Sequence, residues 1–205
     1  MRLQTGNVEA VVAEHFPGAT LLSVERLTGG VAAEVYRLDL KRADKDDTSV
    51  VLRVHGPGYP GLEPALEFQL LQFIETADIP APRPLAVNTD RRLLEYPYLL
   101  LSFVEGTTTI DEDRGDASVA AMADMLAIVH ATPLAGLPEL PQRRDPLPEL
   151  LDYLPLGDDW RTMGERLLEL DVTVYDGTDA LLHGDFWPEN IIWRNGQIAA
   201  VLDWE

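Results

Sequence analysis

The sequence predicts an α+β protein of two lobes, a first lobe up to residue 105 that contains most of the strands and a second lobe from residue 106 that is mainly helical. Two observations carry this prediction. Strand-length apolar segments, separated by glycine, proline and polar turns, dominate the first half of the chain. Helical spacing of apolar residues dominates the second half until the final segment, where two short apolar runs flank Asn195-Gly196. We therefore assign residues 1–105 to an N-terminal lobe and residues 106–205 to a C-terminal lobe.

Helices and strands have clear boundaries in the first lobe. Apolar residues at helical spacing predict a helix over 7–16, and an amphipathic pattern predicts another over 65–77. Prolines make residues 79–86 extended and disfavour a helix there. Strands are expected at 21–27, 34–40 and 50–54, with two further strands within 91–106.

The second lobe is predicted to be helical until its last segment. Residues 117–132 carry small and apolar side chains at helical spacing, and residues 161–170 suggest another helix. Residues 133–150 are rich in proline, so we expect irregular backbone there. Asn195-Gly196 between two short apolar runs predicts a β-hairpin near the end of the chain.

The composition is that of a soluble globular protein, but its charge is strongly acidic. The hydrophobic fraction is 46%, the charged fraction is 25% and the formal net charge is −19. Such a surface repels nucleic-acid backbones and anionic membranes, so we expect neither as a partner. The absence of cysteine excludes disulfides and thiolate metal sites. The first residues have polar and acidic positions unlike those of a secretory signal, and we expect a cytoplasmic location; composition leaves the oligomeric state open.

One segment near the end of the chain carries the side chains that phosphoryl transfer requires. It reads HGDFWPEN over residues 183–190 and is followed by a strand-like run containing Asp203. Transfer needs a carboxylate that orients the acceptor hydroxyl and oxygen ligands that hold Mg²⁺ across the nucleotide phosphates. Asp185, Asn190 and Asp203 together match this need, and the Asp-to-Asn spacing equals that in H-R-D-x-x-x-x-N of protein kinases. Each residue alone would be read as a turn former, so the prediction rests on the combination.

These segments closely resemble the catalytic loop and metal-binding strand of the aminoglycoside phosphotransferase family, to which choline kinases and fructosamine kinases are related. The resemblance extends over nearly the whole chain. It implies a protein-kinase-like fold with a five-stranded antiparallel N-terminal sheet and a mainly helical second lobe. It also implies that Asp185 is the catalytic base and that Asn190 and Asp203 bind Mg²⁺.

Two more residues of the loop are interpreted through the resemblance. His183 is similar to the family's loop histidine, which is mostly architectural, so we expect a hydrogen-bonded structural role for it. Glu189 stands where family members commonly have a smaller residue, which could affect nearby packing or the approach of the substrate.

Upstream residues are expected to bind the nucleotide phosphates. Gly29 and Gly30 lie between two predicted strands, where glycine lets backbone N–H groups approach phosphates; read alone, they are a simple turn. The P-loop pattern G-x-x-x-x-G-K-[ST] is absent. Arg53 occupies the place of the strand lysine of protein kinases, and Glu67 on the following helix resembles its ion-pair partner. The alternative is that Arg53 is a charge on an edge strand and that Glu67 lies on a solvated helix face.

The segment SFVEG resembles the family's hinge, whose backbone meets the nucleotide base. Ser102 and Val104 are therefore expected at the nucleotide, although an ordinary buried strand would look the same. His15 and His55 fit no metal-binding spacing, and we assign them no chemistry.

The resemblance implies transfer of the γ-phosphoryl group of ATP or GTP to a hydroxyl of a small molecule, such as an aminoglycoside, a sugar or an amino alcohol. Proteins that it resembles continue past the metal-binding aspartate, so we expect this chain to be truncated and its second lobe incomplete. The alternative is a non-catalytic module that binds nucleotide or a partner protein. A protein kinase is disfavoured, because HGD replaces HRD, DWE replaces DFG and no A-P-E motif follows.

Overall fold

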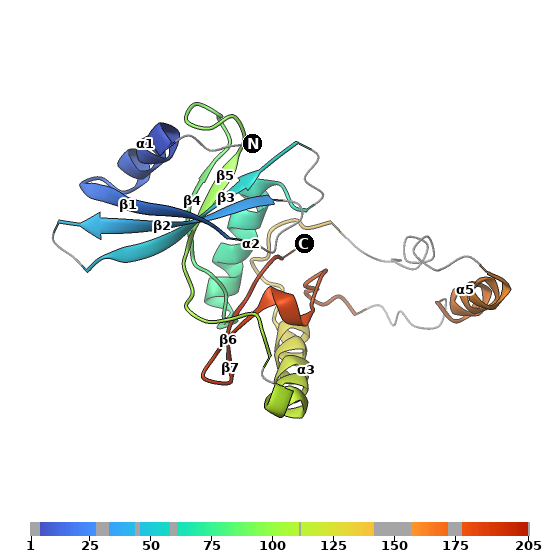
Figure 1. The fold of residues 1–205 in the computed structure, drawn as a ribbon. Coiled ribbons are helices and arrows are strands. Elements are labelled where there is room, and N and C mark those ends of the chain that lie inside the picture. The colour runs from blue at the N-terminus through green and yellow to red at the C-terminus, as the bar shows by residue number, and fades with distance from the viewer. Residues whose placement is uncertain are drawn as a thin grey trace. The chain divides into compact units, whose positions relative to one another are not determined.

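A computed structural model gives the fold (Figure 1). The predicted phosphate-loop residues Gly29 and Gly30 lie outside the residues that it describes. The chain divides into two compact units, one of Met1–Pro138 with Leu181–Glu205 and the other of Glu139–Ala180. The described residues are 5–27, 33–43, 46–57, 61–110, 112–141, 157–171 and 178–204.

A five-stranded antiparallel sheet forms the centre of the first unit, as predicted. The strand order is β1-β2-β3-β5-β4, and each neighbouring pair is antiparallel. The fold is therefore α+β and kinase-like in its sheet. Its elements are α1 (Thr5–His15), β1 (Ala19–Leu27), β2 (Ala33–Arg42), β3 (Thr48–His55), α2 (Pro64–Thr76), β4 (Pro84–Asn88) and β5 (Tyr98–Ser102).

The central strand β3 presents different side chains to the two faces of the sheet. Val50, Leu52 and Val54 belong to a core cluster with the apolar residues of α1. Because successive side chains of a strand point to opposite faces, Arg53 and His55 share the other face, where Glu67 of α2 meets them. One face of β3 thus builds the core and the other carries buried polar groups.

One predicted strand was misplaced. The sequence predicted two strands within 91–106, but only β5 lies there. The fifth strand is β4, which begins in the segment 79–86 that was expected to be merely extended and ends beyond it, at Asn88. Pro84 is compatible with a strand because β4 is at the edge of the sheet, where a missing N–H is tolerated. Leu94 is buried without being in a strand, so the apolar pattern around it reports core packing and not sheet pairing.

The helices and the hairpin after the sheet agree with the predictions for them, while residues 142–150 of the segment expected to be irregular lie outside the described residues. The hairpin turn has positive φ at both Asn195 (55°) and Gly196 (76°), as a two-residue type I′ turn requires. α5, in the second unit, is amphipathic, and none of the helices in the described ranges has the length and hydropathy of a membrane span. These elements are η1 (Glu112–Arg114), α3 (Gly115–Ala131), α5 (Asp158–Asp171), η2 (Pro188–Asn190), β6 (Ile191–Arg194) and β7 (Gln197–Val201).

A short bridge ties the end of β5 to the hairpin. Thr107 N–H donates to Trp193 O at 3.0 Å, and Trp193 N–H donates to Thr107 O at 2.7 Å. Gly106, just before the bridge, has φ of 150°. A Cβ atom at this position would overlap the Trp193 carbonyl oxygen and the Ile192 side chain. Only glycine fits where the chain leaves the sheet and meets the hairpin.

Replacing Gly106 by alanine should therefore destabilise the protein by about 2 kcal/mol or more, because a strained φ and an overpacked contact add. Urea denaturation would measure the loss. Gly56→Ala is the matched control, since a Cβ there meets nothing within 4 Å. Equal stability of the two variants would contradict the tight fit at Gly106.

Candidate active site

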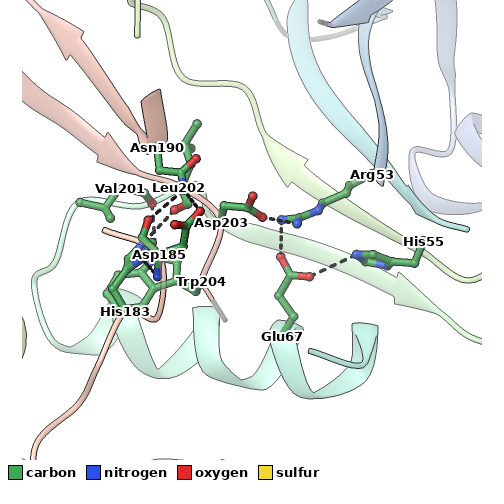
Figure 2. A network of polar contacts seen from close by, with 10 residues as sticks. All are labelled: Arg53, His55, Glu67, His183, Asp185, Asn190, Val201, Leu202, Asp203 and Trp204. Atoms are coloured by element: carbon green, nitrogen blue, oxygen red, sulfur yellow. Dashed lines mark hydrogen bonds and ion pairs between the residues drawn. The ribbon is translucent and has the colours of Figure 1, made fainter. Parts of the chain in front are cut away.

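His183 holds the loop that contains the predicted catalytic residues. Its side chain is buried, its Nε2–H donates to Leu202 O at 2.7 Å, and its Nδ1 accepts the backbone N–H of Asp185 at 3.2 Å (Figure 2). The ring also packs against Phe186 and Trp204. These bonds require the neutral Nε2–H tautomer, and burial lowers the pKa of His183 from its ordinary 6.5, which favours that form. The expected structural role agrees with this geometry.

Asp185 and Asn190 are brought together by the turn of η2. The Asn190 Nδ2–H group donates to both Asp185 O and Asp185 Oδ2, each at 2.9 Å. The Asp185 residue is exposed, so its carboxylate can meet a molecule from solvent. Leu202 N–H donates to Asn190 O at 2.8 Å, which joins this loop to the strand end before Asp203. The two residues that sequence spacing paired are thus in direct contact.

Arg53 is held between two carboxylates that are far apart in sequence. Its Nη1 donates to Glu67 Oε1 at 2.8 Å, and its Nη2 donates to Asp203 Oδ1. Both Arg53 and Glu67 are buried, whereas the Asp203 side chain is partly exposed. Figure 2 shows the Asp203 side chain directed at the Arg53 guanidinium. The predicted ion pair of Arg53 and Glu67 is therefore present. Arg53 forms a second ion pair with Asp203, the predicted metal-binding aspartate.

Asp203 has an unusual backbone conformation. Its φ is 59°, in the left-handed region that aspartate adopts more readily than most residues. The turn follows directly after β7 and aims the side chain back at the sheet. Residues in this region gather at functional sites, where the surrounding structure maintains the strain.

The sequence analysis missed His55. Its Nε2 lies 3.2 Å from Glu67 Oε2, and both side chains are 3% exposed. The signal was present in the i, i+2 spacing of Arg53 and His55, which puts both on one face of a strand. A search for metal-binding patterns could not find it, because its partner lies on a different element.

The remaining predicted nucleotide residues are only partly placed. Ser102, in the last position of β5, pairs with β3, and its Oγ accepts the Arg83 N–H at 2.8 Å. Val104 follows β5 and is half-buried. The structure gives no contact that tests their proposed role, and Gly29 and Gly30 remain outside the described residues.

The donor set fits Mg²⁺ better than a metal held by protein alone. Over the described ranges, no group of three or more His, Cys, Asp or Glu side chains could hold a metal ion. Mg²⁺ does not need one, because it takes one or two protein oxygens together with phosphate oxygens and water. Asp203 offers a partly exposed carboxylate, and Asn190 uses its amide nitrogen on Asp185, which leaves its side-chain oxygen for a hard cation.

Residues 23–205 match the Phosphotransferase enzyme family, APH, a match over most of the chain that includes every candidate site residue. The chain belongs to this family. The family assignment agrees with the resemblance that was based on the segment around Asp185 and Asn190.

One related sequence and two solved structures are also similar to this chain. The chain is 26% identical over 235 residues to acyl-CoA dehydrogenase family member 11 of Gallus gallus, covering all of this chain but 29% of that protein. A candidate aminoglycoside phosphotransferase of Ralstonia eutropha JMP134 has a TM-score of 0.70 at 19% identity, over 99% of this chain and 65% of that one. A thermostable mutant of aminoglycoside phosphotransferase APH(4)-Ia in complex with AMP-PNP and hygromycin B has a TM-score of 0.65 at 18% identity, over 97% of this chain and 70% of that one. The two structural likenesses establish the kinase-like fold. The chain spans less than two thirds of the length of the Gallus gallus relative and of the Ralstonia eutropha protein.

The buried, neutral His183 predicts a pH dependence of stability. The unfolded state takes up a proton near pH 6.5 whereas the folded state resists it, so this stabilisation is present above pH 6.5 and is lost as pH falls. The advantage of the natural protein over His183→Gln in free energy of unfolding should be larger at about pH 7.5 than at about pH 5.5. Denaturant titrations at both values would measure it, and an advantage independent of pH would contradict the neutral tautomer.

Proposed function

We propose that this family member transfers the γ-phosphoryl group of ATP or GTP to a hydroxyl of a small molecule. The observation that carries the proposal is the Arg53 guanidinium bonded to both Glu67 and Asp203. This contact joins a cation of the sheet to the strand end that follows the catalytic loop. Membership of the Phosphotransferase enzyme family supports the same reaction class.

Each residue has a role that follows from its surroundings. The exposed Asp185 orients the acceptor hydroxyl and accepts its proton, while Asn190 fixes the carboxylate by hydrogen bonds. Arg53, held by Glu67, presents a planar cation to phosphate oxygens. Mg²⁺, when bound through Asn190 and Asp203, neutralises charge on the phosphates. Positioning supplies most of the rate enhancement, because the transition state is loose.

Gly29, Gly30, Ser102 and Val104 complete the proposed nucleotide site. The glycines would bring backbone N–H groups to the phosphates, and the segment after β5 would meet the base through its main chain. This part of the proposal rests on the order of the elements in the family, since neither the loop nor the base contact is described by the structure. The lobe division near residue 105 belongs to the same proposal.

Two acceptor classes deserve a direct test. The solved APH(4)-Ia complex contains hygromycin B, so a cationic amino sugar is one class, and the net charge of −19 would attract it. The relative from Gallus gallus is named an acyl-CoA dehydrogenase and is much longer than this chain. A hydroxylated acyl thioester is therefore the second class, because a phosphotransferase segment within such a protein could act on a related acyl compound.

Mg·ATP or Mg·GTP at about one hundred times its Kd should raise the unfolding midpoint by roughly 5–10 °C, from about 2.7 kcal/mol of binding energy. Asp203→Asn should lose the metal-dependent part of this shift while keeping a residue that tolerates the left-handed backbone. Differential scanning fluorimetry with and without Mg²⁺ would measure both.

Glu189→Gln is the control, because it removes an exposed carboxylate from the same loop and should keep the full shift. A shift that survives in Asp203→Asn would refute the metal role of Asp203. No shift in the natural protein would refute the nucleotide site itself.

Turnover separates the enzyme from a module that only binds nucleotide. We expect phosphorylation of one member of an acceptor panel of amino sugars, sugars, amino alcohols and hydroxyacyl thioesters, detected by mass spectrometry. Asp185→Asn should lower kcat by about 100-fold or more while nucleotide binding persists, since it removes only the base. Tight nucleotide binding without turnover on any acceptor would favour the non-catalytic alternative.

A further inference from the structure

A buried histidine beside the Arg53–Glu67 pair has no place in the mechanism above. His55 ends β3, two residues after Arg53, and lies 3.2 Å from Glu67 through its Nε2 atom. Figure 2 shows Arg53 and His55 approaching the same carboxylate from the same side of the sheet. A buried ring in this position can do more than fill space, because it lies beside Oε2, while the hydrogen bond from Arg53 goes to Oε1.

The two oxygens of Glu67 are divided between two partners. Oε1 accepts from Arg53 Nη1 at 2.8 Å, and Oε2 faces His55 Nε2. A carboxylate held at one oxygen can still turn about its last torsion angle, which is broad and soft. A buried polar ring 3.2 Å from the second oxygen restricts that freedom, so Oε1 stays aimed at Arg53.

The backbone of His55 is itself fixed. Its N–H donates to Pro97 O at 3.0 Å, one step beyond the ladder in which Val54 pairs with Tyr98. On the other edge of β3, His55 lies opposite Ala33 of β2 in the antiparallel register. The ring is therefore carried by a central strand that is bonded on both edges, and a rigid strand is a better support than a loop.

We propose that His55 is a positioning residue for nucleotide phosphates, acting through Glu67 on Arg53. This inference rests on the proposed function and assigns a residue to it. The His55 ring, with its Nε2 atom 3.2 Å from Glu67 Oε2, restrains the Glu67 carboxylate; the carboxylate holds the Arg53 guanidinium, and the guanidinium meets the phosphates. His55 touches neither nucleotide nor acceptor.

A matched pair of amides tests the proposal. The side-chain nitrogen of glutamine reaches the place of the histidine Nε2 atom, whereas that of asparagine reaches only the place of Nδ1. His55→Asn should weaken Mg·ATP or Mg·GTP binding about tenfold and raise the nucleotide KM alike, with the acceptor KM unchanged. His55→Gln should stay within about twofold of the natural protein.

The free nucleoside distinguishes positioning from general damage. Adenosine or guanosine has no phosphate, so its Kd should be the same in His55→Asn and in the natural protein, as measured by competition against a fluorescent nucleotide. If His55→Asn does not fold, His55→Phe keeps the ring volume without the N–H group and should show the same selective loss. His15→Asn, which removes a histidine bonded to Tyr98 through the opposite face of the sheet, should leave both affinities unchanged.

The outcomes separate this inference from the function on which it rests. Normal nucleotide affinity in His55→Asn, equal losses for nucleotide and nucleoside, or a glutamine variant as weak as the asparagine variant would each overturn the role of His55 and leave the proposed function intact. No nucleotide binding by the natural protein would overturn both.

Discussion

The buried guanidinium of Arg53 is the group on which the arrangement of this site depends. A charge without counter-ions is costly to bury, so the strand that carries Arg53 requires carboxylates close by. Glu67 of helix α2 supplies one carboxylate, and Asp203, near the end of the sequence, supplies the other. Folding the sheet core and orienting the candidate active site are therefore coupled through one side chain, and the charge fixes the places of β3, α2 and the end of β7 together.

This arrangement also resolves a conflict between the charge of the chain and its chemistry. A net charge of −19 opposes a polyanionic nucleotide, and long-range attraction cannot help to bind it. A cation shielded from solvent interacts strongly at short range, where the effective dielectric constant is lower. Glu67 and Asp203 keep that cation in place, at the expense of partly neutralising it. If Asp203 binds Mg²⁺ as proposed, a phosphate group would gain most when it arrives together with that metal ion.

The sequence predicted features with local signals and missed those that depend on packing. Asn195-Gly196 predicted the hairpin because both residues adopt positive φ readily. The catalytic segment was recognisable because Asp185 and Asn190 meet within one turn of the chain. By contrast, the apolar run around Leu94 has the pattern of a strand, but Leu94 is buried through core packing outside any strand. The edge strand β4 was not predicted, because its proline pointed away from a sheet. The contact of His55 with Glu67 required the placement of a helix against a strand, which no local pattern reports.

The bridge between Thr107 and Trp193 has a mechanical consequence. Within the described residues, Val201 N–H also donates to Pro80 O at 2.8 Å, and Arg53 of the sheet pairs with Asp203 just after the hairpin. The contacts of Thr107 with Trp193 and of Val201 with Pro80 are backbone hydrogen bonds that no ligand competes for, whereas Arg53 with Asp203 is a side-chain contact that an incoming phosphate or cation could exchange. The hairpin would therefore stay attached to the rest of the unit through its backbone even when a ligand displaces Asp203 from Arg53, so that binding at this ion pair would not require the hairpin to detach.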